Sequence, residues 1–226
     1  MKKVILALVA VAMVATASAQ EKKMWIGGTL GIGMAQNKSM GVVGGKENKL
    51  DKFNMVIAPE FGYRLNEKWA VGAQLIYGLG SYKGDALKFQ KGVEGDKLNT
   101  YSLGIAPFVR WNLVSLANGK FTFFFDGSLY YKHNKKAMEG VYDGIVAFLD
   151  GIDPIHTNEW GVGIRPGFMF SPTPSFSLIA KIGFLGFKSE NICNKEAHAY
   201  SYDSNSSWWG LDFSTENLAI GALFNF

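Results

Sequence analysis

The sequence predicts an all-β fold, an eight-stranded antiparallel up-and-down transmembrane β-barrel. Three observations lead to this prediction. Eight segments alternate between apolar and polar or small residues with a period of two. The connections between them alternate between short turns and longer polar stretches. Beyond residue 20 no apolar run is long enough for a membrane helix, and a closed barrel is the other structure that satisfies every backbone group in lipid.

Residues 1–19 carry the features of a secretory signal peptide. Lys2 and Lys3 form a positive region, and "VILALVAVAMVA" is an apolar core that is too short to span a bilayer. The sequence "ASA" before Gln20 fits a small-residue cleavage site, and no cysteine follows it as in a lipoprotein. We therefore expect export from the cytoplasm and a barrel domain over residues 20–226.

The first four strands are expected in "KMWIGGTLGIGMAQ", "KFNMVIAPEFGYRL", "WAVGAQLIYGLG" and "TYSLGIAPFVRW". In each, every second residue is large and apolar, which fits a face in contact with lipid. The other face consists mainly of glycine, alanine and a few polar or charged residues. Trp25 is an exception, because its position in the alternation points inward.

The last four strands are expected in "FTFFFDGSLYYK", "EWGVGIRPGFMF", "FSLIAKIGF" and "ENLAIGALFNF". The alternation in the seventh segment places Phe176, Ile182 and Phe184 toward lipid and Lys181 inward. The connections "NEK", "NLVSLANGK" and "SPTPS" are short, and the four others are longer and polar. Short turns in the periplasm and long loops outside are typical of an outer-membrane barrel.

Aromatic residues gather at both ends of the expected lipid face. The turn-side set is Tyr63, Trp69, Trp111, Phe121, Phe170, Phe176 and Phe226, and the loop-side set is Tyr82, Tyr101, Tyr131 and Trp160. Amphipathic rings favour the two headgroup zones, so these sets fit two aromatic girdles.

An eight-stranded barrel is narrow enough for side chains to fill its lumen. The inward positions include an ionic cluster with one amide: Glu60, Arg64, Gln74, Arg110, Asp126, Arg165 and Lys181. Cations exceed anions in this set. Charges in a lumen need partners, so we expect a plug of ion pairs; a solute or proton path is the alternative.

Pro59, Pro107 and Pro166 recur in the three strands expected to run toward the periplasm. Proline cannot donate a ladder hydrogen bond, and a closed barrel has no edge strand to accommodate it. We therefore expect a β-bulge or a local bend at each proline.

Residues that could carry chemistry are few. "GGTLGIG" lacks the Lys-Ser/Thr of a phosphate-binding loop and fits a glycine-rich strand. No histidine has a second metal ligand at suitable spacing, and Cys193 is the single cysteine, so no metal, cofactor or internal disulfide is expected. Lipid A-modifying barrels use Ser and His. The pairs Ser128 with His133 and His156 with Glu159 are the nearest candidates, but neither fits the Ser-after-His spacing of the deacylase type.

The net charge of +4 includes the two signal-peptide lysines, and Lys and Arg are not clustered, so nucleic acid is excluded as a partner. The stretch Glu139–Ile152 is apolar for an exposed loop. It fits either a short helix over the barrel mouth or a surface for a partner or the outer leaflet.

The chain ends in "GALFNF", where Gly221, Phe224 and Phe226 match the terminal signal that outer-membrane barrels present to the assembly machinery; Ala219 departs from the usual polar residue. With "APEFGYRLNEKWAVGAQLIYG", the chain resembles the small porin-family, OmpA/OmpX-like barrel domains abundant in Bacteroidota, Gram-negative bacteria. The resemblance implies an outer-membrane location, with lipid and the assembly machinery as partners.

The function expected from these observations is a structural or surface-interaction role, with long extracellular loops whose ligand the sequence does not identify. A small low-conductance channel is the alternative, and a lipid A-modifying enzyme is the third class.

Overall fold

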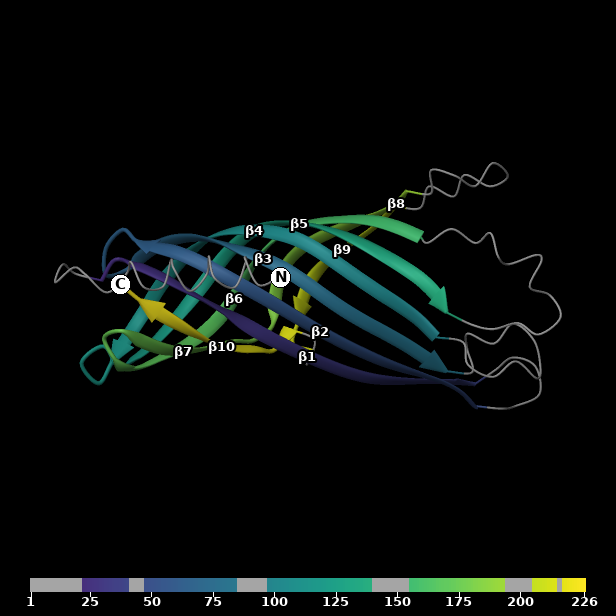
Figure 1. Ribbon diagram of the computed structural model, residues 1–226, viewed down its shortest axis with the longest axis horizontal. Helices are drawn as coiled ribbons and strands as arrows, with labels where there is room; N and C mark the ends of the chain where they lie inside the picture. The colour runs from purple at the N-terminus through teal and green to yellow at the C-terminus, as the bar shows by residue number, and fades with distance from the viewer. Residues whose placement is uncertain (1–21, 41–46, 85–96, 140–154, 194–204, 215–216) are drawn as a thin grey trace, which may run out of the picture.

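The computed structural model describes residues 22–40, 47–84, 97–139, 155–193, 205–214 and 217–226. The expected signal peptide and all of the apolar loop stretch except Glu139 lie outside these ranges. Ten strands wind around one axis (Figure 1). They are β1 (Met24–Met40), β2 (Glu47–Arg64), β3 (Trp69–Gly84), β4 (Lys97–Leu116), β5 (Phe121–Glu139), β6 (Ile155–Thr173), β7 (Phe176–Lys181), β8 (Phe184–Cys193), β9 (Asn205–Asp212) and β10 (Ala219–Asn225). Within the described ranges, no helix has the length and apolarity needed to cross a membrane.

Eight of these strands form a closed antiparallel ring. The order is β1–β2–β3–β4–β5–β6–β7–β10, and β10 pairs back with β1. Strand β8 continues β7 along β6, and β9 pairs with β8 above β10. The predicted eight-stranded antiparallel barrel is therefore confirmed, and its seventh and eighth wall strands are each in two pieces.

The seventh wall strand is interrupted at Ile182 and Gly183. Gly183 has φ of +73°, a left-handed conformation that favours glycine. The pairing of β6 passes from Gly167↔Lys181 below the break to Ile164↔Leu185 above it, so the upper strand contains one extra residue. One extra residue reverses which face a side chain takes. Phe184 is therefore buried in the lumen, and the prediction that it faces lipid was wrong.

The ring of strands is closed only in the lower part of the barrel, toward the short turns. Strand β1 pairs with β10 up to Gly31↔Ala219. Above that point, within the described residues, β1 pairs only with β2 and β9 pairs only with β8. The upper wall therefore has two strand edges, contrary to the expectation of a barrel without edges.

The three prolines each interrupt one ladder. Pro59 pairs with β1, Pro107 with β3 and Pro166 with β5, while the ladder to the following strand skips each of them. The register across the gaps at Pro59 and Pro107 is unchanged, so neither position carries a bulge, and the alternative of a local bend stays a prediction. At Pro166 the skipped ladder coincides with the extra residue near Gly183. At Pro59 and Pro107 the missing donor therefore costs a ladder contact without inserting a residue.

The outward face is apolar and carries aromatic contacts at its turn end. Trp69 stacks on Trp111 with ring centres 6.0 Å apart, and Phe121 stacks on Phe170 at 4.7 Å. Near the loop end, Trp160 lies 5.3 Å from Phe187. These rings lie on the outside of the wall, where they suit the headgroup zones of a bilayer.

Candidate functional site

Four charged side chains meet at mid-height of the lumen and form a closed ring. This ion ring consists of Glu60, Arg110, Asp126 and Lys181. Arg110 donates to Asp126 through Nε at 2.7 Å and Nη2 at 2.9 Å, and its Nη2 also lies 3.1 Å from Glu60. Lys181 Nζ lies 2.7 Å from Glu60 and 2.9 Å from Asp126. Each cation therefore contacts both carboxylates, and the ring is electrically balanced.

The strand register brings the ring together. Arg110 of β4 and Asp126 of β5 stand directly opposite each other in the ladder. Glu60 comes from β2 and Lys181 from β7, so the ring connects distant parts of the wall across the lumen. All four side chains are at least 96% buried. Buried ions need partners of opposite charge, and here each ion has two.

Neutral donors complete the environment of Glu60. The Trp25 indole Nε1–H donates to Glu60 Oε1 at 3.1 Å, and the Gln74 amide donates to Oε2 at 3.4 Å. Glu60 thus accepts from four residues. Each of its two carboxylate oxygens accepts two hydrogen bonds, as a carboxylate in a dry interior requires.

An aromatic layer surrounds the ring and lies against inward glycines. A Cβ on Gly62 would come within 2.0 Å of the Trp25 ring, and one on Gly167 within 2.3 Å of Phe124. The Arg110 guanidinium lies over Phe124, 4.3 Å from the ring centre. Glycine therefore makes room for flat rings against the wall. The role of Phe124 was not predicted, although its position between inward Thr122 and Asp126 places it in the lumen.

The ring and the aromatic layer separate two cavities. The outer cavity, toward the loop end, has a volume of about 340 Å³, and Asp126 and Lys181 lie at its floor. The inner cavity, toward the turn end, has a volume of about 1210 Å³. Glu60 and Arg110 line neither cavity. Packed side chains therefore lie across the lumen between the two cavities.

Two arginines of the expected cluster lie outside the ring. Arg64 is at the turn end, where it donates to Asn225 Oδ1 at 2.9 Å and to the Lys22 carbonyl at 3.0 Å. Arg165 lies in the outer cavity, with its guanidinium 5.6 Å from the centre of the Phe184 ring. The expected inward set contained more cations than anions because it included Arg64 and Arg165, which lie outside the balanced ion ring.

The candidate catalytic pairs are not assembled. Ser128 lines the outer cavity, whereas His133 is exposed on the opposite face of β5. His133 instead meets His156, with Nε2 and Nδ1 3.1 Å apart, while Glu159 lies inside against Lys132. Within the described residues, no group of three or more His, Cys, Asp or Glu is arranged to hold a metal ion.

Trp25→Phe is expected to lower the free energy of unfolding by about 1.5–3 kcal/mol, because it removes a hydrogen bond to a buried carboxylate. The measurement is urea-induced unfolding of the protein refolded in lipid vesicles. Trp209→Phe is the matched control, since Trp209 is 83% exposed and should change little. Equal stabilities of the two variants would contradict a role for the indole N–H.

Comparison with known proteins agrees with this architecture. A family model described as "outer membrane protein beta-barrel domain" matches residues 17–189. The structure is similar to outer membrane protein OprG from Pseudomonas aeruginosa, with a TM-score of 0.51, 15% identity, and coverage of 91% of this chain and 97% of that one. Neisserial surface protein A also matches, at 14% identity and a TM-score of 0.41, with coverage of 90% of this chain and 97% of that one.

A major outer membrane protein from Thermus thermophilus also matches, at 13% identity and a TM-score of 0.43, with coverage of 90% of this chain and 99% of that one. No curated protein sequence matches this chain. At 15% identity the OprG structure informs the fold alone.

Proposed function

Because this chain belongs to the outer membrane protein β-barrel domain family, we propose that it is a structural outer-membrane barrel with a closed lumen, whose loop end serves surface interaction. The observation that carries the proposal is the balanced ion ring between the two cavities. A solute that crossed the barrel would have to break buried ion pairs and displace packed aromatic rings. Such a rearrangement is costly, because it leaves charges without partners in a dry interior.

A low-conductance channel is the second candidate. The two cavities face each other across one thin layer, so an opening at the ion ring would join them. The packing of Trp25, Phe124 and the four ions argues against a path that is open at rest.

Catalysis on lipid A has the least support. Ser128 and His133 take opposite faces of β5, and nucleophilic catalysis needs a base within hydrogen-bond reach of the nucleophile. We therefore include the absence of enzymatic activity in the proposal. Unchanged lipid A mass spectra in cells that overproduce the protein are the expected result, and a new lipid A species would contradict it.

The proposal also includes the route to the membrane. Residues 1–19 would direct export as a cleaved signal peptide, and Gly221, Phe224 and Phe226 would be read by the barrel-assembly machinery. In the folded protein Phe224 is exposed on the outer wall and packs against Phe176, with ring centres 5.4 Å apart. Phe224 can therefore be read as a signal before folding and contact lipid afterwards.

Release of a small sugar from proteoliposomes tests the closed lumen. Vesicles that contain the refolded protein should retain entrapped arabinose as well as protein-free vesicles do, because packed side chains occupy the middle of the barrel. A general porin reconstituted at the same molar ratio provides the positive control. Rapid release through the wild-type protein would contradict the proposal and favour the channel.

A further inference from the structure

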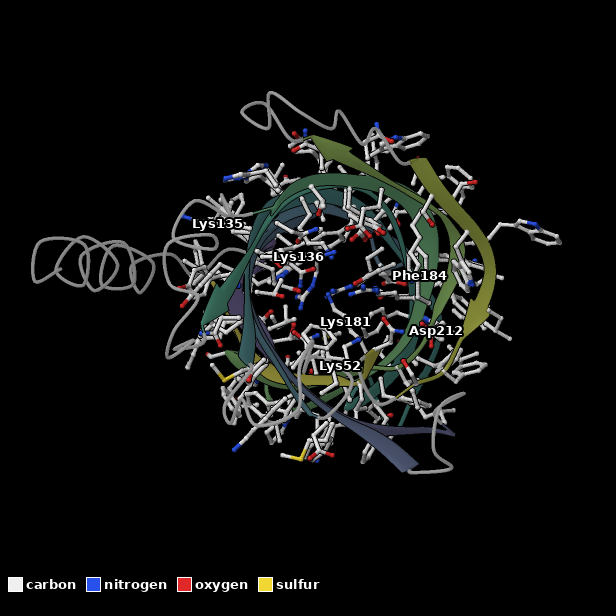
Figure 2. The ribbon with its side chains drawn as sticks, turned by 90° about the vertical axis from the view of Figure 1, so that its right-hand side faces the viewer. Lys52, Lys135, Lys136, Lys181, Phe184 and Asp212 are labelled. Carbon is white, nitrogen blue, oxygen red and sulfur yellow. The ribbon has the colours of Figure 1, made fainter. Side chains whose placement is uncertain are left out.

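The outer cavity is lined by more cations than carboxylates. The six cations are Lys52, Lys132, Lys136, Arg165, Lys181 and Lys188, and the four carboxylates are Asp126, Glu159, Glu190 and Asp212. Figure 2 views the barrel from the loop end, where Lys181, Phe184 and Asp212 are seen around the lumen. The surplus of positive charge makes this cavity attractive to anions.

Three of the four carboxylates are already neutralised by partners. Asp126 belongs to the ion ring. Glu159 pairs with Lys132 at 2.9 Å, and Glu190 pairs with Lys136 at 3.0 Å. The fourth, Asp212, accepts a hydrogen bond from the Ser214 backbone N–H at 2.9 Å.

Arg165 forms no hydrogen bond or ion pair within the described part of the chain, although Asp126 and Glu159 attract it at longer range. Its Nε is buried without a hydrogen bond, and its guanidinium forms no ion pair with a described residue. Its neighbour in the ladder, Asp126, is occupied by Arg110 and Lys181. A guanidinium carries five donors in a planar fork that matches a carboxylate or phosphate group. The donors of Arg165 are therefore available for a ligand.

Lys188 repeats this arrangement on the neighbouring strand. Its Nζ lies 4.6 Å from the centre of the Trp208 ring, and it forms no close ion pair with a described residue, although Asp212 attracts it at longer range. Trp208 stacks on Phe184 with ring centres 6.3 Å apart. Arg165 and Lys188 thus flank one aromatic pair, which combines two cations with an apolar surface.

Glycines fix the rings of this site in the wall. A Cβ on Gly163 would come within 2.5 Å of Phe184, and one on Gly161 within 2.6 Å of Tyr130. Tyr130 in turn packs edge-on against Phe184 and donates to Glu159 at 2.8 Å. The aromatic surface is therefore held in place before any ligand binds, and such preorganisation favours binding.

We propose that the outer cavity binds a small ring-bearing organic anion, a carboxylate or a phosphate ester, with its oxyanion on Arg165 and its ring beside Phe184. Lys188 adds a second positive charge. A volume of about 340 Å³ is at the lower end of the range for small-molecule sites, so the ligand is small. This inference goes beyond the proposed function and does not depend on whether the barrel conducts, because the site lies above the ion ring.

Isothermal titration calorimetry of the refolded protein in an uncharged detergent tests the proposal. The probes are benzoate, phenyl phosphate, inorganic phosphate and benzamide, the neutral counterpart of benzoate. The variants are Arg165→Gln, Arg165→Lys and Lys188→Gln, and Lys83→Gln is the control because Lys83 is exposed and lines neither cavity. Heat-modifiable gel mobility verifies that each variant is folded.

Saturable binding of benzoate and phenyl phosphate, without binding of benzamide, is expected for the wild type and for Lys83→Gln. Arg165→Gln should weaken binding at least about tenfold, as loss of hydrogen bonds to a charged group does, and Arg165→Lys and Lys188→Gln should weaken it less. No saturable heat, equal binding of benzamide, or unchanged affinity in a folded Arg165→Gln variant would overturn the site. Inorganic phosphate that binds as tightly as phenyl phosphate would overturn the requirement for a ring.

Discussion

Replacement of Glu60 by alanine is expected to lower the free energy of unfolding by about 3–5 kcal/mol. Glu60 accepts from Arg110, Lys181, Trp25 and Gln74, and its side chain is fully buried. Without it, two cations share the single carboxylate of Asp126, and a buried indole N–H loses its acceptor. Removal of one member of a buried ion network costs more than the net stabilisation by the network, because it leaves one buried charge uncompensated.

The measurement is urea-induced unfolding in lipid vesicles, followed by tryptophan fluorescence and by heat-modifiable gel mobility. Glu67→Ala provides the matched control, since Glu67 is exposed in the turn between β2 and β3 and its loss should change stability by less than about 0.5 kcal/mol. A Glu60→Ala variant as stable as Glu67→Ala would show that the ion ring does not hold the barrel together.

Gly221→Ala is expected to prevent or strongly weaken closure of the barrel, with a loss of at least about 2–3 kcal/mol. Gly221 lies where β10 meets β1, and a Cβ there would come within 1.9 Å of the Gly28 carbonyl oxygen. The obstacle is backbone, so a change of side-chain rotamer cannot relieve it. The two strands would have to move apart at the contact that completes the ring.

Refolding from urea into detergent micelles tests this closure without the cellular assembly machinery. The variant should remain unfolded or show a much lower unfolding midpoint than the wild type. Gly127→Ala is the control, because the nearest atom to a Cβ at Gly127 is 3.9 Å away. Normal refolding of Gly221→Ala in vitro, combined with failed assembly in cells, would assign the glycine to the terminal signal instead of the closure.

The eight-stranded barrel could be predicted from the sequence because strand alternation is local and repeats in each hairpin. The alternation of short and long connections likewise predicted toward which end of the barrel each strand runs. The break at Gly183 could not be predicted from this pattern, since a single inserted residue in "FSLIAKIGF" leaves the apolar alternation looking continuous. That insertion turned Phe184 inward and created the aromatic surface of the outer cavity.

The sequence identified the four members of the ion ring among seven inward polar residues, but it did not separate them from Arg64 and Arg165. Which charges meet depends on register and on the height of each residue in the wall. The pairing Arg110↔Asp126 follows from the ladder, whereas the contact of Glu60 with Lys181 crosses the lumen. Apart from Trp25, the inward aromatic residues were not predicted, because large apolar side chains were expected to face lipid.

The central claim is that the ion ring closes the lumen, and single-channel recording in planar lipid bilayers tests it most directly. The wild-type protein should insert without steady unitary conductance. The double variant Glu60→Ala/Arg110→Ala should leak ions, because two of the side chains that fill the space between the cavities are shortened. Steady conductance through the wild-type protein that is the same in the double variant would contradict the account, since the ion ring would then not be the barrier.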